Sequence, residues 1–68
     1  MALTLRELKT ARSFLRQAQM LIAGVSSLFF NASDAKTSAR LNDLITRLTD
    51  EIGLIERRIR NLHKEENA

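Results

Sequence analysis

Two stretches of this 68-residue chain decide its fold: residues 8–29, LKTARSFLRQAQMLIAGVSSLF, and residues 41–62, LNDLITRLTDEIGLIERRIRNL. In each stretch apolar residues recur at alternating steps of three and four. The first row is Leu8, Ala11, Leu15, Ala18, Ile22, Val25 and Phe29, and the second is Leu41, Ile45, Leu48, Ile52, Ile55, Ile59 and Leu62. Because residues three and four apart share one face of an α-helix, each stretch predicts a helix with one apolar seam.

The steps of the second row run in the reverse order of those in the first. If the chain turns back between the rows, each residue of the first row lies opposite one residue of the second. The pairs run from Leu8 with Leu62 to Phe29 with Leu41. An antiparallel coiled coil needs such a matched seam. The sequence therefore predicts an all-α protein, built as an antiparallel two-helix coiled-coil hairpin in a single domain.

The first helix has a clear start signal in the sequence. Thr4 and Glu7 form the pattern of a capping box, in which each side chain accepts a hydrogen bond from the backbone N–H of the other residue. An acid in the first turn is also favoured by the positive end of the helix dipole. We predict a helix over residues 5–30.

The polar tetrapeptide NASD at residues 31–34 is predicted to form the turn. Either Ser33 or Asp34 can cap the second helix, because both side chains accept hydrogen bonds from free backbone N–H groups. We predict that this helix spans residues 35–63. Residues 64–68 are expected to form a polar tail that frays.

The size of the chain limits how stable it is by itself. A chain of this length buries only about 60% of its unfolded surface. It has no cysteine for a disulfide, and its single histidine means that a metal site would have to consist mostly of carboxylates. Small domains without these supports are completed by association. We therefore expect self-association or a helical protein partner, and no cofactor.

Some apolar residues fall beside the single seam that a two-helix hairpin provides. Phe14, Leu21 and Leu28 lie seven residues apart on the first helix. Exposed apolar rows often mark an interface, although amphipathic helices also widen their own core face in this way. We predict that this row binds a partner. Three further apolar residues are predicted to contribute, namely Phe30, Leu44 and Leu54.

Both segments at the open end of the hairpin are basic. Residues 6–16 and residues 56–64 each contain four cations and one acid. Basic clusters attract phosphates or acidic partners, but basic side chains also cover ordinary solvated helix surfaces. If the open end binds nucleic acid, the contacting residues are predicted to be Arg12, Arg16, Arg57, Arg58 and Arg60.

Neither catalysis nor a membrane span is predicted. His63 has no serine or cysteine nucleophile at a spacing that implies a catalytic triad, so we do not expect an enzyme. The most apolar stretch, residues 20–30, is too short to cross a hydrocarbon core of about 30 Å. The absence of cysteine fits a reducing cytoplasm, which is the expected location.

Short local motifs accompany the predicted hairpin: DAK at residues 34–36, then Leu48, Glu51 and the run IGLI at residues 52–55. With these motifs, its length and its topology, the chain resembles the small two-helix co-chaperones of type III secretion needle subunits. The resemblance implies a cytoplasmic protein that pairs with a helical-repeat chaperone. Together the two would keep a needle subunit soluble and unpolymerised before export.

Two functions from different classes are therefore open. The first is a non-enzymatic interaction module whose spare apolar row binds another helical protein, such as a type III secretion chaperone. The alternative is a nucleic-acid-binding regulator. In that case two hairpins would dimerise into a four-helix bundle, and the basic open ends would contact phosphates.

Overall fold

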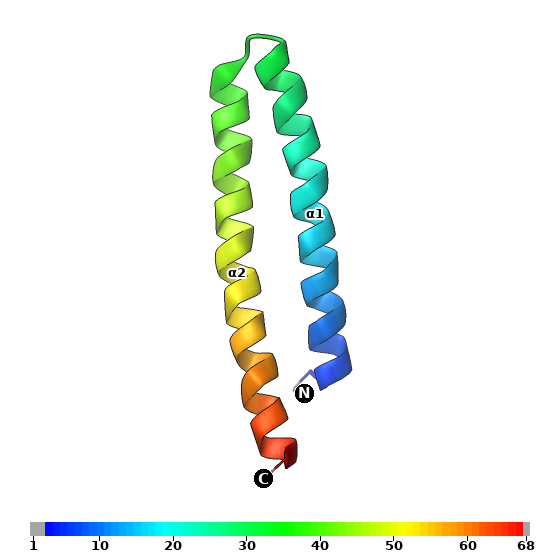
Figure 1. The fold of residues 1–68 in the computed structure, drawn as a ribbon. Coiled ribbons are helices and arrows are strands. Elements are labelled where there is room, and N and C mark those ends of the chain that lie inside the picture. The colour runs from blue at the N-terminus through cyan, green and yellow to red at the C-terminus, as the bar shows by residue number, and fades with distance from the viewer. Residues whose placement is uncertain (1–2, 68) are drawn as a thin grey trace.

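The computed structural model describes residues 3–67, with the side chains of residues 66 and 67 excepted. Two helices, α1 (Leu5–Asn31) and α2 (Ala35–Asn67), lie side by side and antiparallel, joined by a tight turn (Figure 1). The predicted all-α hairpin is confirmed. Its radius of gyration is 15.6 Å, whereas a compact domain of this length has one of about 11 Å. The molecule is therefore a rod, and a rod exposes more surface per residue than a globular domain does.

The start of α1 follows the predicted capping box. The Glu7 N–H donates to the Thr4 hydroxyl at 3.1 Å, and the Thr4 N–H donates to the Glu7 carboxylate at 3.0 Å. The bond from the backbone of Thr4, and then the bond with its side chain, lower the pKa of Glu7 below its ordinary value of 4.5. Both bonds use N–H groups that the first turn of a helix leaves without partners.

The end of α1 is closed by two backbone hydrogen bonds. The Asp34 N–H donates to the Phe29 carbonyl at 2.8 Å, and the Ser33 N–H donates to the Phe30 carbonyl at 3.0 Å. This pair of bonds is the Schellman arrangement, which requires a left-handed residue after the helix. Ser33 takes that conformation, with a φ of 66°.

Asp34 then caps the start of α2, which begins at Ala35. Its carboxylate accepts a hydrogen bond from the Thr37 N–H at 3.1 Å and another from the Thr37 hydroxyl at 2.9 Å. Of the two capping residues left open by the sequence, the structure therefore selects Asp34. Ser33 instead provides the reversal of the backbone.

The far end of α2 differs from the prediction. The helix was expected to end at residue 63, but it continues to Asn67. Lys64 and Glu65 are good helix formers, and no glycine or proline follows them to stop the helix. A cation in the last turn, here Lys64, is also favoured by the negative end of the helix dipole. Ala68 lies outside the described residues.

The seam between the helices forms the core. Its buried apolar residues, among those that the structure describes, are Leu8, Ile52 and Ile59. Most of the other predicted seam positions are half-buried. A two-helix rod covers each seam residue from one side only, so the hairpin has a narrow core that relies on few buried side chains.

Near the turn the seam departs from the predicted row. Val25 and Phe29 are 42% and 38% exposed, while Ser26 is only 4% exposed. A helix with 3.6 residues per turn drifts by about 20° per heptad against a strict seven-residue repeat. Over the three heptads from Leu8 to Phe29 the drift reaches about 60°. Because of this drift, the residue that faces α2 near the turn is Ser26, and no longer its neighbour Val25.

Near the turn, where Val25 and Phe29 are partly exposed, a cluster of polar residues lies between the two helices. The Ser26 hydroxyl lies 2.8 Å from the Ser38 hydroxyl, 3.2 Å from the Ser38 carbonyl and 2.9 Å from Asn42 Oδ1. One heptad earlier on α1, the Gln19 amide donates to the Thr49 hydroxyl at 2.7 Å. No buried side-chain polar atom in the described part of the chain lacks a partner. Polar pairing therefore replaces apolar packing on this flank.

Candidate interaction surface

Phe14, Leu21 and Leu28 form an apolar row on α1, which we call the α1 row. It lies on the side of the hairpin opposite the polar cluster. Phe14, Leu21 and Leu28 are 64%, 73% and 70% exposed, so the hairpin does not use them as core. At about 100° per residue, Leu21 and Ser26 lie about 140° apart around α1. The two flanks of the hairpin therefore differ in chemistry: one is sealed by hydrogen bonds, and the other presents apolar side chains to solvent.

The two predicted residues on α2 lie in different places. Leu44 and Leu54 are both exposed. Leu44 lies about 40° from Leu48, at the edge of the seam, whereas Leu54 lies about 160° from the buried Ile52. Leu54 therefore projects from the back of α2. It is separated from the α1 row and is an isolated apolar residue of the kind common on protein surfaces.

Phe30 lies near the turn on the polar side of α1. It is exposed and lines a shallow cleft of about 400 Å³ that also includes Ser26, Ser38 and Asn42. The ring is therefore not part of the continuous row that contains Leu21 and Leu28. The six residues predicted for partner binding thus divide into an α1 row with Leu44 beside it, and two separate positions.

The basic residues predicted for nucleic-acid contact are also divided. Arg16 pairs with Glu56 across the helices, at 3.4 Å, and Arg12 is half-buried. The other three predicted contacts are exposed and belong to none of the ion pairs found in the described residues; they are Arg57, Arg58 and Arg60. An exposed pair such as Arg16 with Glu56 contributes about 1 kcal/mol or less.

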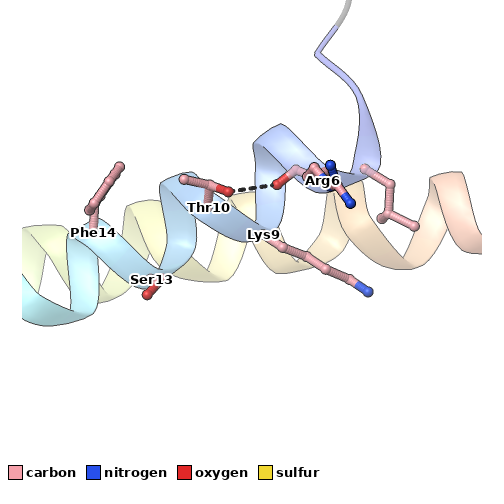
Figure 2. Close-up of a pocket in the computed structure, with 6 residues that line it drawn as sticks. Arg6, Lys9, Thr10, Ser13 and Phe14 are labelled. Carbon is pink, nitrogen blue, oxygen red and sulfur yellow. Dashed lines mark hydrogen bonds between the residues drawn. The ribbon is translucent and has the colours of Figure 1, made fainter.

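Two open clefts lie at the basic end. One, of about 470 Å³, runs along the first turns of α1, where Figure 2 shows Arg6, Thr10 and Phe14 on successive turns and Lys9 projecting to the other side. The other, of about 510 Å³, has the buried Ile59 as its apolar floor. Its rim is formed by Lys9, Arg60, His63 and Lys64. Cationic side chains therefore surround apolar surface at this end.

The described residues show no group of three or more acidic, histidine or cysteine side chains that could hold a metal ion. In the same part of the chain, no helix is sufficiently long and apolar to span a bilayer. His63 lies exposed on the rim of the second basic cleft.

Two features of this surface were missed from the sequence. Met20 is exposed and adds apolar surface to the back of α1. The polar cluster was missed as well, although its signal is present in the spacing. Gln19 and Ser26 are seven residues apart on α1, and Asn42 and Thr49 are seven apart on α2. Matched polar heptad rows on facing helices predict a hydrogen-bonded flank.

No protein family, curated protein or solved structure matches this chain. The surface itself therefore carries the functional argument. Its main elements are the exposed α1 row, the uncharged segment at residues 17–33 that contains most of that row, and the basic open end.

Proposed function

We propose that this protein is a non-enzymatic interaction module whose α1 row binds a helix of another protein. The observation that carries the proposal is the exposure of Phe14, Leu21 and Leu28 on a hairpin in which only three apolar residues of the described part of the chain are buried. Amphipathic helices commonly bind in grooves through apolar anchors at heptad spacing. A helix laid along the row would cover it and widen the narrow core.

The resemblance to type III secretion co-chaperones supplies a partner class for this surface. A helical-repeat chaperone would contact the α1 row, and the complex would keep a needle subunit soluble in the cytoplasm. The uncharged character of residues 17–33 supports this choice, because a long uncharged apolar face suits a helix-lined groove. The cytoplasmic location belongs to the same proposal.

The test is purification of the tagged protein from its native host, with the bound proteins identified by mass spectrometry. Leu21→Asp should release a helical partner, because it places a charge in the middle of the row. Leu54→Asp is the matched control, since the same substitution then lies on the back of α2. Circular dichroism should show both variants to be equally helical. Retention of the same partner by both variants would contradict the proposal.

The client is tested separately by co-expression. A needle subunit expressed with this protein and its chaperone partner should remain in the soluble fraction. The same subunit expressed with Leu21→Asp should sediment as polymer, whereas Leu54→Asp should behave as the unmodified protein does. Equal sedimentation with and without the hairpin would remove the co-chaperone assignment and leave the interaction module in place.

The alternative function is nucleic-acid binding by a dimer, and one observation favours it. Arg57, Arg58 and Arg60 are exposed and belong to no ion pair in the described residues, so they are available to phosphates. A gel shift at about 50 mM salt should then detect RNA or DNA binding that falls steeply as salt rises. The double variant Arg57→Glu with Arg58→Glu should abolish it. No shift at this salt concentration eliminates the alternative.

A further inference from the structure

We propose that a second copy of this chain covers the α1 row when no other partner is bound, with the two α1 helices antiparallel. In this pairing Leu21 of each copy lies over Gly24 of the other. The inference rests on the proposed use of the α1 row as a binding surface, and it names the occupant of that surface in the purified protein.

The single hairpin exposes more surface than a compact protein of the same mass. Its accessible surface is 5430 Å² for a mass of 7.7 kDa. A compact monomer of this mass exposes about 4,300 Å². The excess of about 1,100 Å² exceeds the roughly 800 Å² that each partner contributes to a standard protein interface. One copy therefore has enough surplus surface for a dimer interface.

Residues are regularly spaced along the exposed face of α1. The positions that share it recur at steps of three and four: Phe14, Gln17, Leu21, Gly24, Leu28 and Asn31. Because these steps read the same in both directions, the row can pair with an antiparallel copy of itself. Each rung then joins a large apolar side chain to a glycine or an uncharged amide, with Leu21 opposite Gly24 at the centre.

Gly24 supports this arrangement because its own hairpin gives it no packing role. A Cβ added at Gly24 would meet nothing within 4 Å. Glycine inside a helix is nevertheless unfavourable, since it loses more backbone freedom on folding than alanine does. A small residue in the middle of an apolar row lets the axis of a second helix approach closely.

Charge selects the antiparallel orientation. The four cations of α1 all precede residue 17, and residues 17–33 carry no charge. A parallel pair would place the two basic segments side by side, where like charges repel. An antiparallel pair places them at opposite ends, and the uncharged halves of the two helices meet in the middle.

Sedimentation equilibrium over a range of protein concentrations tests the pairing. The unmodified protein should reach twice the mass of one chain. Gly24→Glu should weaken the dimer by at least about tenfold, because it places a charge in the apolar interface. Gly53→Glu is the matched control. The Cβ added at Gly53 also meets nothing within 4 Å, but this residue lies on α2, outside the row, so the dimer should be unchanged.

The orientation is tested with a spin label on Lys9→Cys, because the chain has no other cysteine. In the proposed register residue 9 of each copy lies about 20 Å from the central pair of Leu21 with Gly24, at 1.5 Å per residue, and the two copies of residue 9 lie in opposite directions from it. The labels are then about 40 Å apart along the axis, at 1.5 Å per residue. A parallel pair would hold them within about 20 Å.

A mass of one chain at all concentrations would overturn the inference, as would equal effects of Gly24→Glu and Gly53→Glu. A short label distance would overturn the antiparallel register. None of these outcomes decides whether a different protein binds the row, since the purification with Leu21→Asp measures that separately. Loss of that partner in a protein that is always monomeric would leave the interaction module standing and remove only the self-pairing.

Discussion

The buried serine pair at the turn end of the hairpin allows a quantitative test of the polar flank. Ser26 and Ser38 are 4% and 5% exposed, and their hydroxyl groups are 2.8 Å apart. Ser26 also lies 2.9 Å from Asn42 Oδ1. A hydroxyl has one hydrogen to donate, so Ser26 can donate one bond and accept another. Ser26→Ala therefore removes about two hydrogen bonds and leaves the buried Ser38 hydroxyl with fewer partners.

The expected cost follows from these bonds. At about 0.5–1.5 kcal/mol for each bond, Ser26→Ala should lower the free energy of unfolding by about 2 kcal/mol. Ser38→Ala removes one bond and should cost about 1 kcal/mol. The double variant should also cost about 2 kcal/mol, because the bond between the two serines is lost only once. The coupling energy between the two sites is therefore about 1 kcal/mol.

Urea unfolding of the four proteins, followed by helical circular dichroism at one protein concentration, measures this cycle. Ser27→Ala is the control, since Ser27 is the exposed neighbour on the same helix and reports only the higher helix propensity of alanine. In thermal melts, Ser26→Ala should lower Tm by about 8–16 °C. Additivity of the two single variants within about 0.3 kcal/mol would refute the direct bond between the serines.

Four further substitutions test the caps and the seam. Ser33→Gly should stabilise the protein by about 1 kcal/mol in urea unfolding, because glycine adopts the left-handed φ of 66° without strain; a loss of stability would contradict the turn geometry. Asp34→Ala should cost about 1 kcal/mol in the same assay through loss of the cap on α2, and an unchanged midpoint would argue against that cap. Because folding lowers the pKa of Glu7, its carboxylate stabilises the folded protein at pH values above the ordinary pKa of 4.5, and this stability is lost as pH falls through the folded pKa. Glu7→Gln should therefore flatten the acid side of a plot of Tm against pH. An identical acid slope in the variant would count against the capping box. Ala18→Leu should overpack the seam and cost about 1–3 kcal/mol, and an unchanged Tm would show that the helices are not closely packed there.

The two helices were predictable because their signals are local and repeated. The heptad rows, the capping box at Thr4 and the polar turn each act within a few residues. The division of roles between Ser33 and Asp34 was not predictable, since either side chain can cap a helix. That choice depends on which residue takes the left-handed conformation, and the backbone bonds to the end of α1 decide it.

The composition of the seam near the turn was not predictable from the apolar row alone. A row written at seven-residue spacing assumes that the helices supercoil enough to keep the row facing the partner helix. A hairpin of this length follows the straight-helix geometry closely enough for Ser26 to replace Val25. The matched polar rows, Gln19 with Ser26 and Asn42 with Thr49, indicate that Ser26 faces α2. The longer apolar row predicts Val25 at that position instead.

The same drift also shapes the binding surface. As Ser26 enters the seam, Val25 and Phe29 turn partly outward, toward the flank that contains Leu21 and Leu28. The apolar face therefore broadens toward the turn and narrows toward the basic end. A partner helix gains most of its apolar contact near the turn, where α1 carries no charge. Val25→Asp should consequently weaken binding of a partner helix more than Phe14→Asp does, although Phe14 is the larger and more exposed residue. Titrations of the two variants that gave the reverse order would show that the partner contacts the basic end instead.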